Sequence, residues 1–175
     1  MSFVIKYSLF LCIYWVLVFS GKQSQQYPNP FLSLKYDKVV AYDYNGDYGQ
    51  AIVDAGNVVD SLINQQVELD QSLIKQLNFT LGDTSTYGGA TAFCFVPHLG
   101  IVYFDQESVV AHVSICFQCN DLRSSIEIPA MRQANKKIKI SEEYSYFARG
   151  FTEKGKSELN QLCVDLGFDN CLDKQ

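Results

Sequence analysis

The chain is poor in residues that several common activities need. It has two histidines, one tryptophan and four prolines among 175 residues. Its 14 Lys and Arg are outnumbered by 19 Asp and Glu, which gives a formal net charge of -5. Nucleic-acid binding needs cations that neutralise phosphates, so this balance argues against a nucleic-acid partner. Chemistry that needs imidazole has only His98 and His112 to draw on.

Apolar runs long enough to cross a membrane are also missing. The run Leu9–Phe19 follows the single charge of Lys6 and ends before small residues, whereas a spanning helix needs about 20 apolar residues. This pattern is typical of a secretory signal peptide, which we place at residues 1–20. An uncleaved anchor that begins at Phe3 is the alternative, and it is the only membrane contact that we expect. The sequence therefore predicts export, to a periplasmic or extracellular location.

The rest of the chain has ordinary globular composition, with 47% hydrophobic and 19% charged residues. Its length is that of one domain. Residues 21–35 are polar and contain Pro28 and Pro30, so we expect a flexible N-terminal tether there. Residues 36–175 are then a single domain.

Hydrophobic spacing predicts both strands and helices in that domain. Lys38–Tyr44 is a β-rich run, and Asp54-Ala55-Gly56-Asn57 has the composition of a hairpin turn. Leucines recur at every fourth position over Leu69–Leu81, which indicates an amphipathic helix, and Thr152–Leu166 predicts a second helix. Because the strands and helices do not alternate regularly, we expect an α+β fold. Its sheet should be mostly antiparallel, with the helices on one face.

The longest β signal is a hairpin made by Ala92–Asp105 and Ser108–Cys116, with Gln106-Glu107 as its loop. A constant register pairs Asp105 with Ser108 and carries His98 opposite Ile115. It also brings the cysteines of both arms to one end. Alternation along the second arm directs one set of side chains to the core: Val109, Ala111, Val113, Ile115 and Phe117.

Cys94, His98, Cys116 and Cys119 form the most unusual set of side chains in the sequence. Three cysteines and one histidine suit tetrahedral zinc, and the C-x-x-C spacing lets one turn supply two ligands. We therefore predict a zinc site from these four residues. Two alternatives stay open, namely a disulfide such as Cys94 to Cys119 and a redox-active C-x-x-C pair.

Two further cysteines lie near the C-terminus. Cys163 and Cys171 are eight residues apart, with Gly167 between them. A helix that turns back at Gly167 brings them within reach of each other, so we predict a disulfide. Removal of residues 1–20 leaves five cysteines, and an odd number means that at least one is not in an internal disulfide.

The segment also resembles an uncharacterised family of exported bacterial proteins of the Bacteroidetes type. The resemblance rests on Cys94-Phe95-x-Pro97-His98-x-Gly100-Ile101-Val102-Tyr103-Phe104-Asp105, followed by Ala111-His112-Val113-Ser114-Ile115-Cys116-Phe117-x-Cys119-Asn120. The order Tyr103-Phe104 and the presence of Leu99 depart from the family pattern. The resemblance implies an exported bacterial setting and implies no mechanism.

Two classes of function follow from these observations. The first is a non-enzymatic exported domain in which the Cys/His cluster stabilises the hairpin and which binds a partner. The second is a thiol-dependent enzyme or oxidoreductase that uses Cys116 and Cys119. We favour the first, because Asn120–Ser125 is turn-like and supplies no helix start to activate a thiol.

Overall fold

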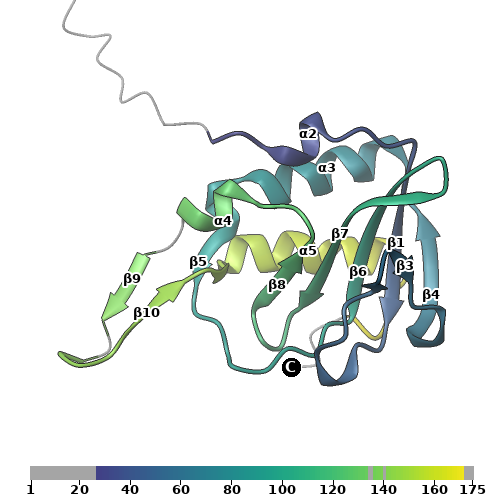
Figure 1. Cartoon of the computed structure of the whole chain (residues 1–175). Coiled ribbons are helices and arrows are strands. Elements are labelled where there is room, and N and C mark those ends of the chain that lie inside the picture. The colour runs from purple at the N-terminus through teal and green to yellow at the C-terminus, as the bar shows by residue number, and fades with distance from the viewer. Residues whose placement is uncertain (1–26, 134–135, 140, 172–175) are drawn as a thin grey trace, which may run out of the picture.

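The protein is a single α+β domain built on a five-stranded antiparallel sheet, as the sequence predicts (Figure 1). The computed structural model describes residues 27–133, 136–139 and 141–171. The strand order is β4-β1-β6-β7-β8. The five strands are β1 (Lys38–Tyr44), β4 (Ile63–Glu68), β6 (Leu99–Asp105), β7 (Ser108–Cys116) and β8 (Asp121–Ser124).

The helices α3 (Gln71–Gly82) and α5 (Glu153–Asp165) lie together behind the sheet in Figure 1. The Asp70 carboxylate accepts from the Leu73 N–H, and the Thr152 hydroxyl accepts from the Gly155 N–H, so both helices begin at a side-chain cap. Their apolar faces and the near face of the sheet make the main core. This core confirms that the helices cover one face. Its largest fully buried members include Phe31, Leu81, Leu99, Ile101, Tyr103, Ile115, Leu159 and Phe168.

The opposite face of the sheet is covered by chain without long helices. The hairpin of β2 (Val53–Asp54) and β3 (Asn57–Val58) turns at Ala55 and Gly56, both at positive φ, as its composition predicts. The N–H of Ile52 donates to the Ser114 hydroxyl over 3.1 Å. A smaller core forms here from seven buried side chains: Val40, Tyr42, Tyr44, Ile52, Val53, Val102 and Phe104.

The β6–β7 hairpin has the predicted loop but not a constant register. Asp105 pairs with Ser108, but a bulge between Tyr103 and Phe104 shifts the register by one residue. Ile115 therefore lies opposite Leu99 and not opposite His98. The extra residue also rotates Val109 away from the helices, so Val109 packs on the smaller core and not on the main core. Ala111, Val113, Ile115 and Phe117 reach the main core as expected. The predicted inward position of Val109 is therefore wrong, because one inserted residue reverses the alternation.

The predicted first arm of this hairpin is too long. Strand β6 begins at Leu99, and residues 92–98 are not a strand. Pro97 lacks an N–H, which favours an end to regular pairing there. Residues 120–125 are expected to form a turn, but four of them form the edge strand β8.

The segment predicted as a tether is packed in its second half. Residues 30–33 form the short helix α2 (Pro30–Ser33), whose Phe31 is 1% exposed in the main core. The free energy gained by burying one large aromatic side chain offsets the conformational entropy lost when a short polar segment is ordered. Residues 1–26, which include the predicted signal peptide and the first half of the tether, lie outside the described residues.

The remaining elements are short. The helix α4 (Pro129–Gln133) follows β8, β9 (Lys136–Lys139) pairs with β10 (Ser145–Ala148), and β5 (Tyr87–Gly89) pairs with β11 (Gly150–Phe151). In Figure 1 the β9–β10 ribbon projects from the body. No helix within the described ranges has both the length and the apolar character to cross a membrane.

Candidate functional site

Cys116 and Cys119 are joined in a disulfide at the end of β7. Both residues are 0% exposed, and their Cα atoms lie 5.4 Å apart. The Cys116 sulfur also accepts hydrogen bonds from two backbone N–H groups, those of Cys119 at 3.2 Å and Val96 at 3.4 Å. The bond therefore joins two neighbours of one turn, whereas the sequence analysis named Cys94 and Cys119 as an example of a pair.

The zinc site predicted from Cys94, His98, Cys116 and Cys119 is not assembled. The Cys116–Cys119 disulfide uses two of the three sulfur ligands. His98 Nδ1 lies 3.1 Å from the Tyr44 carbonyl oxygen and 3.0 Å from the Asn170 side-chain nitrogen. Across residues 27–133, 136–139 and 141–171, no group of three or more His, Cys, Asp or Glu side chains could hold a metal ion.

The C-terminal cysteines form the second disulfide, between Cys163 of α5 and Cys171, as their spacing predicts. Gly167, with a φ of 67°, reverses the chain between them. The bond keeps Asn170 close to the end of β1. There its N–H donates to the Asp43 carboxylate over 2.9 Å, and its side chain donates to the Tyr44 carbonyl over 3.1 Å. This disulfide therefore holds Asn170 against the sheet.

A crossing segment, Thr91–Val96, passes over the Cys116–Cys119 turn. Its Ala92 N–H donates to the Cys119 carbonyl over 2.9 Å, and its Val96 N–H donates to the Cys116 sulfur. Phe95 packs on both disulfide cysteines. Cys94 lies between the two attachment points, is exposed, and is the only described cysteine outside a disulfide.

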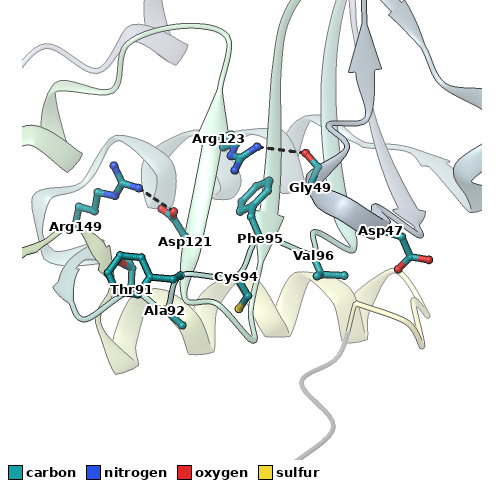
Figure 2. Close-up of a pocket in the computed structure, with 11 residues that line it drawn as sticks. Asp47, Gly49, Thr91, Ala92, Cys94, Phe95, Val96, Asp121, Arg123 and Arg149 are labelled. Atoms are coloured by element: carbon teal, nitrogen blue, oxygen red, sulfur yellow. Dashed lines mark hydrogen bonds and ion pairs between the residues drawn. The ribbon is translucent and has the colours of Figure 1, made fainter.

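A cleft of about 690 Å³ opens between the crossing segment, the loop after β1 and strand β8 (Figure 2). Its volume falls in the range of small-ligand pockets. Figure 2 places the Arg149–Asp121 pair at one end, Asp47 at the other, and Arg123 with Phe95 between them. The lining consists of Asp47, Gly49, Thr91–Val96, Asp121, Arg123 and Arg149.

Arg123 of β8 is held flat by two contacts. Its guanidinium carbon lies 4.0 Å from the centroid of the Phe95 ring, and its Nη1 donates to the Gly49 carbonyl over 3.2 Å. Gly49 has a φ of 80°, which glycine adopts without the penalty that a side chain brings. No carboxylate pairs with Arg123 among the described residues. The guanidinium thus keeps donors free for a ligand.

The wall beside Arg123 depends on a close backbone contact. The N–H of Gly46 donates to the Pro97 carbonyl over 3.0 Å, and a Cβ at Gly46 would lie 2.6 Å from that oxygen. This contact joins the loop after β1 to the end of the crossing segment. It therefore fixes Gly49 above Arg123.

Arg149 forms an ion pair with Asp121, with 3.1 Å between Nη2 and Oδ2. The Asp121 side chain is only 9% exposed, while that of Arg149 is 55% exposed. Asp121 thus anchors Arg149 at the mouth of the cleft, and the exposed part of the guanidinium faces solvent.

Neither histidine lines the cleft. His112 lies on β7, half-buried, and burial holds its pKa below the ordinary value of 6.5. Among the described residues, no group forms a hydrogen bond with its buried Nδ1. His112 is therefore a half-buried strand residue outside the cleft.

The arginines of the cleft have no distinguishing signal in the sequence. Arg123 and Arg149 are isolated cations in the sequence, and nothing in their spacing separates them from any exposed arginine. Phe95 was part of the resemblance motif, but its role under Arg123 depends on the path of the crossing segment.

No protein-family model, curated protein or solved structure matches the chain.

Proposed function

We propose that the protein is an exported binding domain whose cleft holds a carboxylate group of a peptide partner. The observation that carries the proposal is Arg123, which is oriented by Phe95 and Gly49 and has no carboxylate partner among the described residues. A planar guanidinium with free N–H groups matches the two oxygens of a carboxylate. Because its orientation is fixed before binding, little side-chain entropy is lost on association.

The rim of the cleft offers a second contact for a peptide. Phe93 is fully exposed, at 112% of its reference area, although aromatic side chains of this size are usually at least partly covered. Aromatic residues beside an arginine are typical of the energetic centres of protein interfaces. Phe93 therefore offers an exposed aromatic surface to a peptide in the cleft.

Export is part of this proposal and is supported by the two disulfides. Such bonds persist mainly in oxidising compartments, outside the cytosol. Both are buried. One closes the turn after β7, and the other joins Cys171 to α5.

The test uses a pool of acetylated pentapeptides with free C-terminal carboxylates, and the same pool with amidated C-termini. Binding is followed by amide chemical shifts of the oxidised protein. We expect the free-carboxylate pool to shift the signals of Gly49, Arg123 and the crossing segment. Arg123→Gln should weaken this binding at least about tenfold, as loss of a charged hydrogen bond does.

Arg132→Gln is the matched control. Arg132 is also an exposed arginine, paired with Glu127 at 3.0 Å, but it lies outside the cleft. The variant should bind like the unmodified protein. Equal binding of both pools, or equal affinity of Arg123→Gln and Arg132→Gln, would refute carboxylate recognition in the cleft.

A further inference from the structure

We infer that Cys94, Cys116 and Cys119 form a three-cysteine exchange site, through which the buried disulfide oxidises an external thiol. This inference rests on the cysteines alone and does not depend on peptide binding. It differs from a C-x-x-C pair that reacts directly, because Cys116 and Cys119 are both 0% exposed. An external thiol has no access to these sulfurs in the folded protein.

Cys94 is placed to connect the buried pair with solvent. It is exposed, and it lies two residues from each point where the crossing segment is attached to the disulfide turn. Ala92 is attached to Cys119, and Val96 is attached to the sulfur of Cys116. A short segment attached at both ends keeps its middle residue near the disulfide, at a high effective concentration.

The two sulfurs of the disulfide are not equivalent as leaving groups. Cys116 accepts two backbone N–H hydrogen bonds, from Val96 and Cys119. Such donors stabilise a negatively charged sulfur, and a better-stabilised thiolate leaves faster in exchange. Attack by Cys94 should therefore occur at Cys119, with Cys116 as the leaving group.

The exchange balances without an added oxidant. Cys94 loses its proton to solvent, and its thiolate attacks the Cys119 sulfur. The Cys94–Cys119 bond forms, the Cys116–Cys119 bond breaks, and the electron pair stays on Cys116. An external thiolate then attacks Cys94 and releases Cys119 as a thiolate. A second external thiolate attacks the mixed disulfide and frees Cys94. Two external thiols become one disulfide, while the Cys116–Cys119 disulfide becomes two thiols.

Glutathione serves as the probe thiol, with the oxidised protein and its Cys94→Ser variant compared at neutral pH. Samples are quenched with acid, and the loss of each disulfide is measured by alkylation and peptide mass. We expect the Cys116–Cys119 bond to be reduced at least about tenfold more slowly in Cys94→Ser, because the direct route is closed by burial. In the unmodified protein, a glutathione adduct should appear on Cys94.

The Cys163–Cys171 bond is the internal control. Its cysteines are 0% and 2% exposed, and no third described cysteine is free except Cys94 on the crossing segment. Its reduction rate should be the same in both proteins, and should be slower than that of Cys116–Cys119 only when Cys94 is present. If Cys94→Ser and Cys94→Ala lose the Cys116–Cys119 bond at the unmodified rate, the exchange site is refuted, whatever the outcome for peptide binding.

Discussion

The Tyr103 hydroxyl donates a 2.7 Å hydrogen bond to the side-chain oxygen of Asn78, within the layer between the sheet and α3. Asn78 in turn donates to the Tyr36 hydroxyl, and its carbonyl accepts from Asn29 beside α2. Asn78 is 3% exposed, and its bond to Tyr103 is buried, while its bonds to Tyr36 and Asn29 are partly buried. Asn78 therefore connects a central strand, a helix and the N-terminal segment.

Tyr103→Phe should destabilise the protein by about 1–3 kcal/mol, because the Asn78 oxygen is left buried without a donor. The free energy of unfolding in urea measures the effect. Tyr144→Phe removes a hydroxyl from a side chain that is 70% exposed and should change stability little. A Tyr103→Phe variant as stable as Tyr144→Phe would show that the bond contributes nothing.

His112 should make the protein less stable in mildly acidic solution. Burial lowers its pKa below 6.5 in the folded state, so the unfolded chain binds a proton more readily than the folded chain. Its contribution is complete above about pH 6.5 and is lost as the pH falls towards the folded pKa. The unfolding free energy should therefore decline as the pH falls below about 6.5. The decline should be smaller in His112→Gln; an unchanged slope would contradict the assignment.

Asp83 should give the stability of the protein a second pH dependence, at lower pH than that of His112. A hydrogen bond from the Ser85 backbone, together with Lys154 nearby, holds the pKa of its carboxyl below 3.8. Its stabilising contribution is present above the unfolded pKa and is lost as the pH falls below about 4. Asp83→Asn should flatten the stability curve there and leave the His112 window unchanged. A loss of slope above about pH 5 in this variant would assign the effect to the wrong group.

Gly100→Ala should be destabilising because the hairpin before β4 packs directly on β6. A Cβ at Gly100 would lie 2.8 Å from the Cβ of Ile52, and that atom cannot rotate away. Overpacking of this kind costs about 1–3 kcal/mol. Ile52→Ala removes the Ile52 Cγ1 and Cγ2 atoms, which would lie 2.8 and 3.1 Å from the new Cβ. Combining it with Gly100→Ala should therefore cost less than the sum of the two single changes, which a double-mutant cycle in urea measures. Simple additivity would show that the two sites do not touch.

Loss of the Cys163–Cys171 disulfide should cost about 2–3 kcal/mol, the amount that chain entropy gives for a loop of this size. The double variant Cys163→Ala/Cys171→Ala tests this in thermal and urea unfolding. Because Asn170 lies next to Cys171 and contacts Asp43 and Tyr44, the amide signals of β1 should also shift. Unchanged stability together with unchanged β1 signals would show that Asn170 holds the chain end without the bond.

The sequence predicts the helices and strands whose hydrophobic pattern extends over many residues. It does not predict features that depend on a single residue, such as a β-bulge. Leu77 and Leu81 of α3 are buried as their spacing indicates. The bulge between Tyr103 and Phe104, which leaves Val110 as the extra residue on β7, has no such signal. A register fixed by such a local choice follows from packing and cannot be read from alternation.

The candidate site likewise contains one feature that the sequence predicts and one that it does not. The C-x-x-C spacing identifies Cys116 and Cys119 as a unit, but it does not decide between a metal ligand pair and a disulfide. Arg123 becomes notable only when Phe95 and Gly49, distant in sequence, are brought to it. Contacts between segments that pair only in the folded chain leave no local pattern.

Both disulfides join cysteines that are close in sequence, with separations of 3 and 8 residues. Each loop can close before the sheet is assembled, because bringing such near neighbours together costs little chain entropy. Formation of these disulfides therefore does not require that the strands have already paired in the order β4-β1-β6-β7-β8. An enzyme that oxidises the emerging chain meets sulfur pairs that need no distant partner, so correct pairing does not have to wait for the native topology.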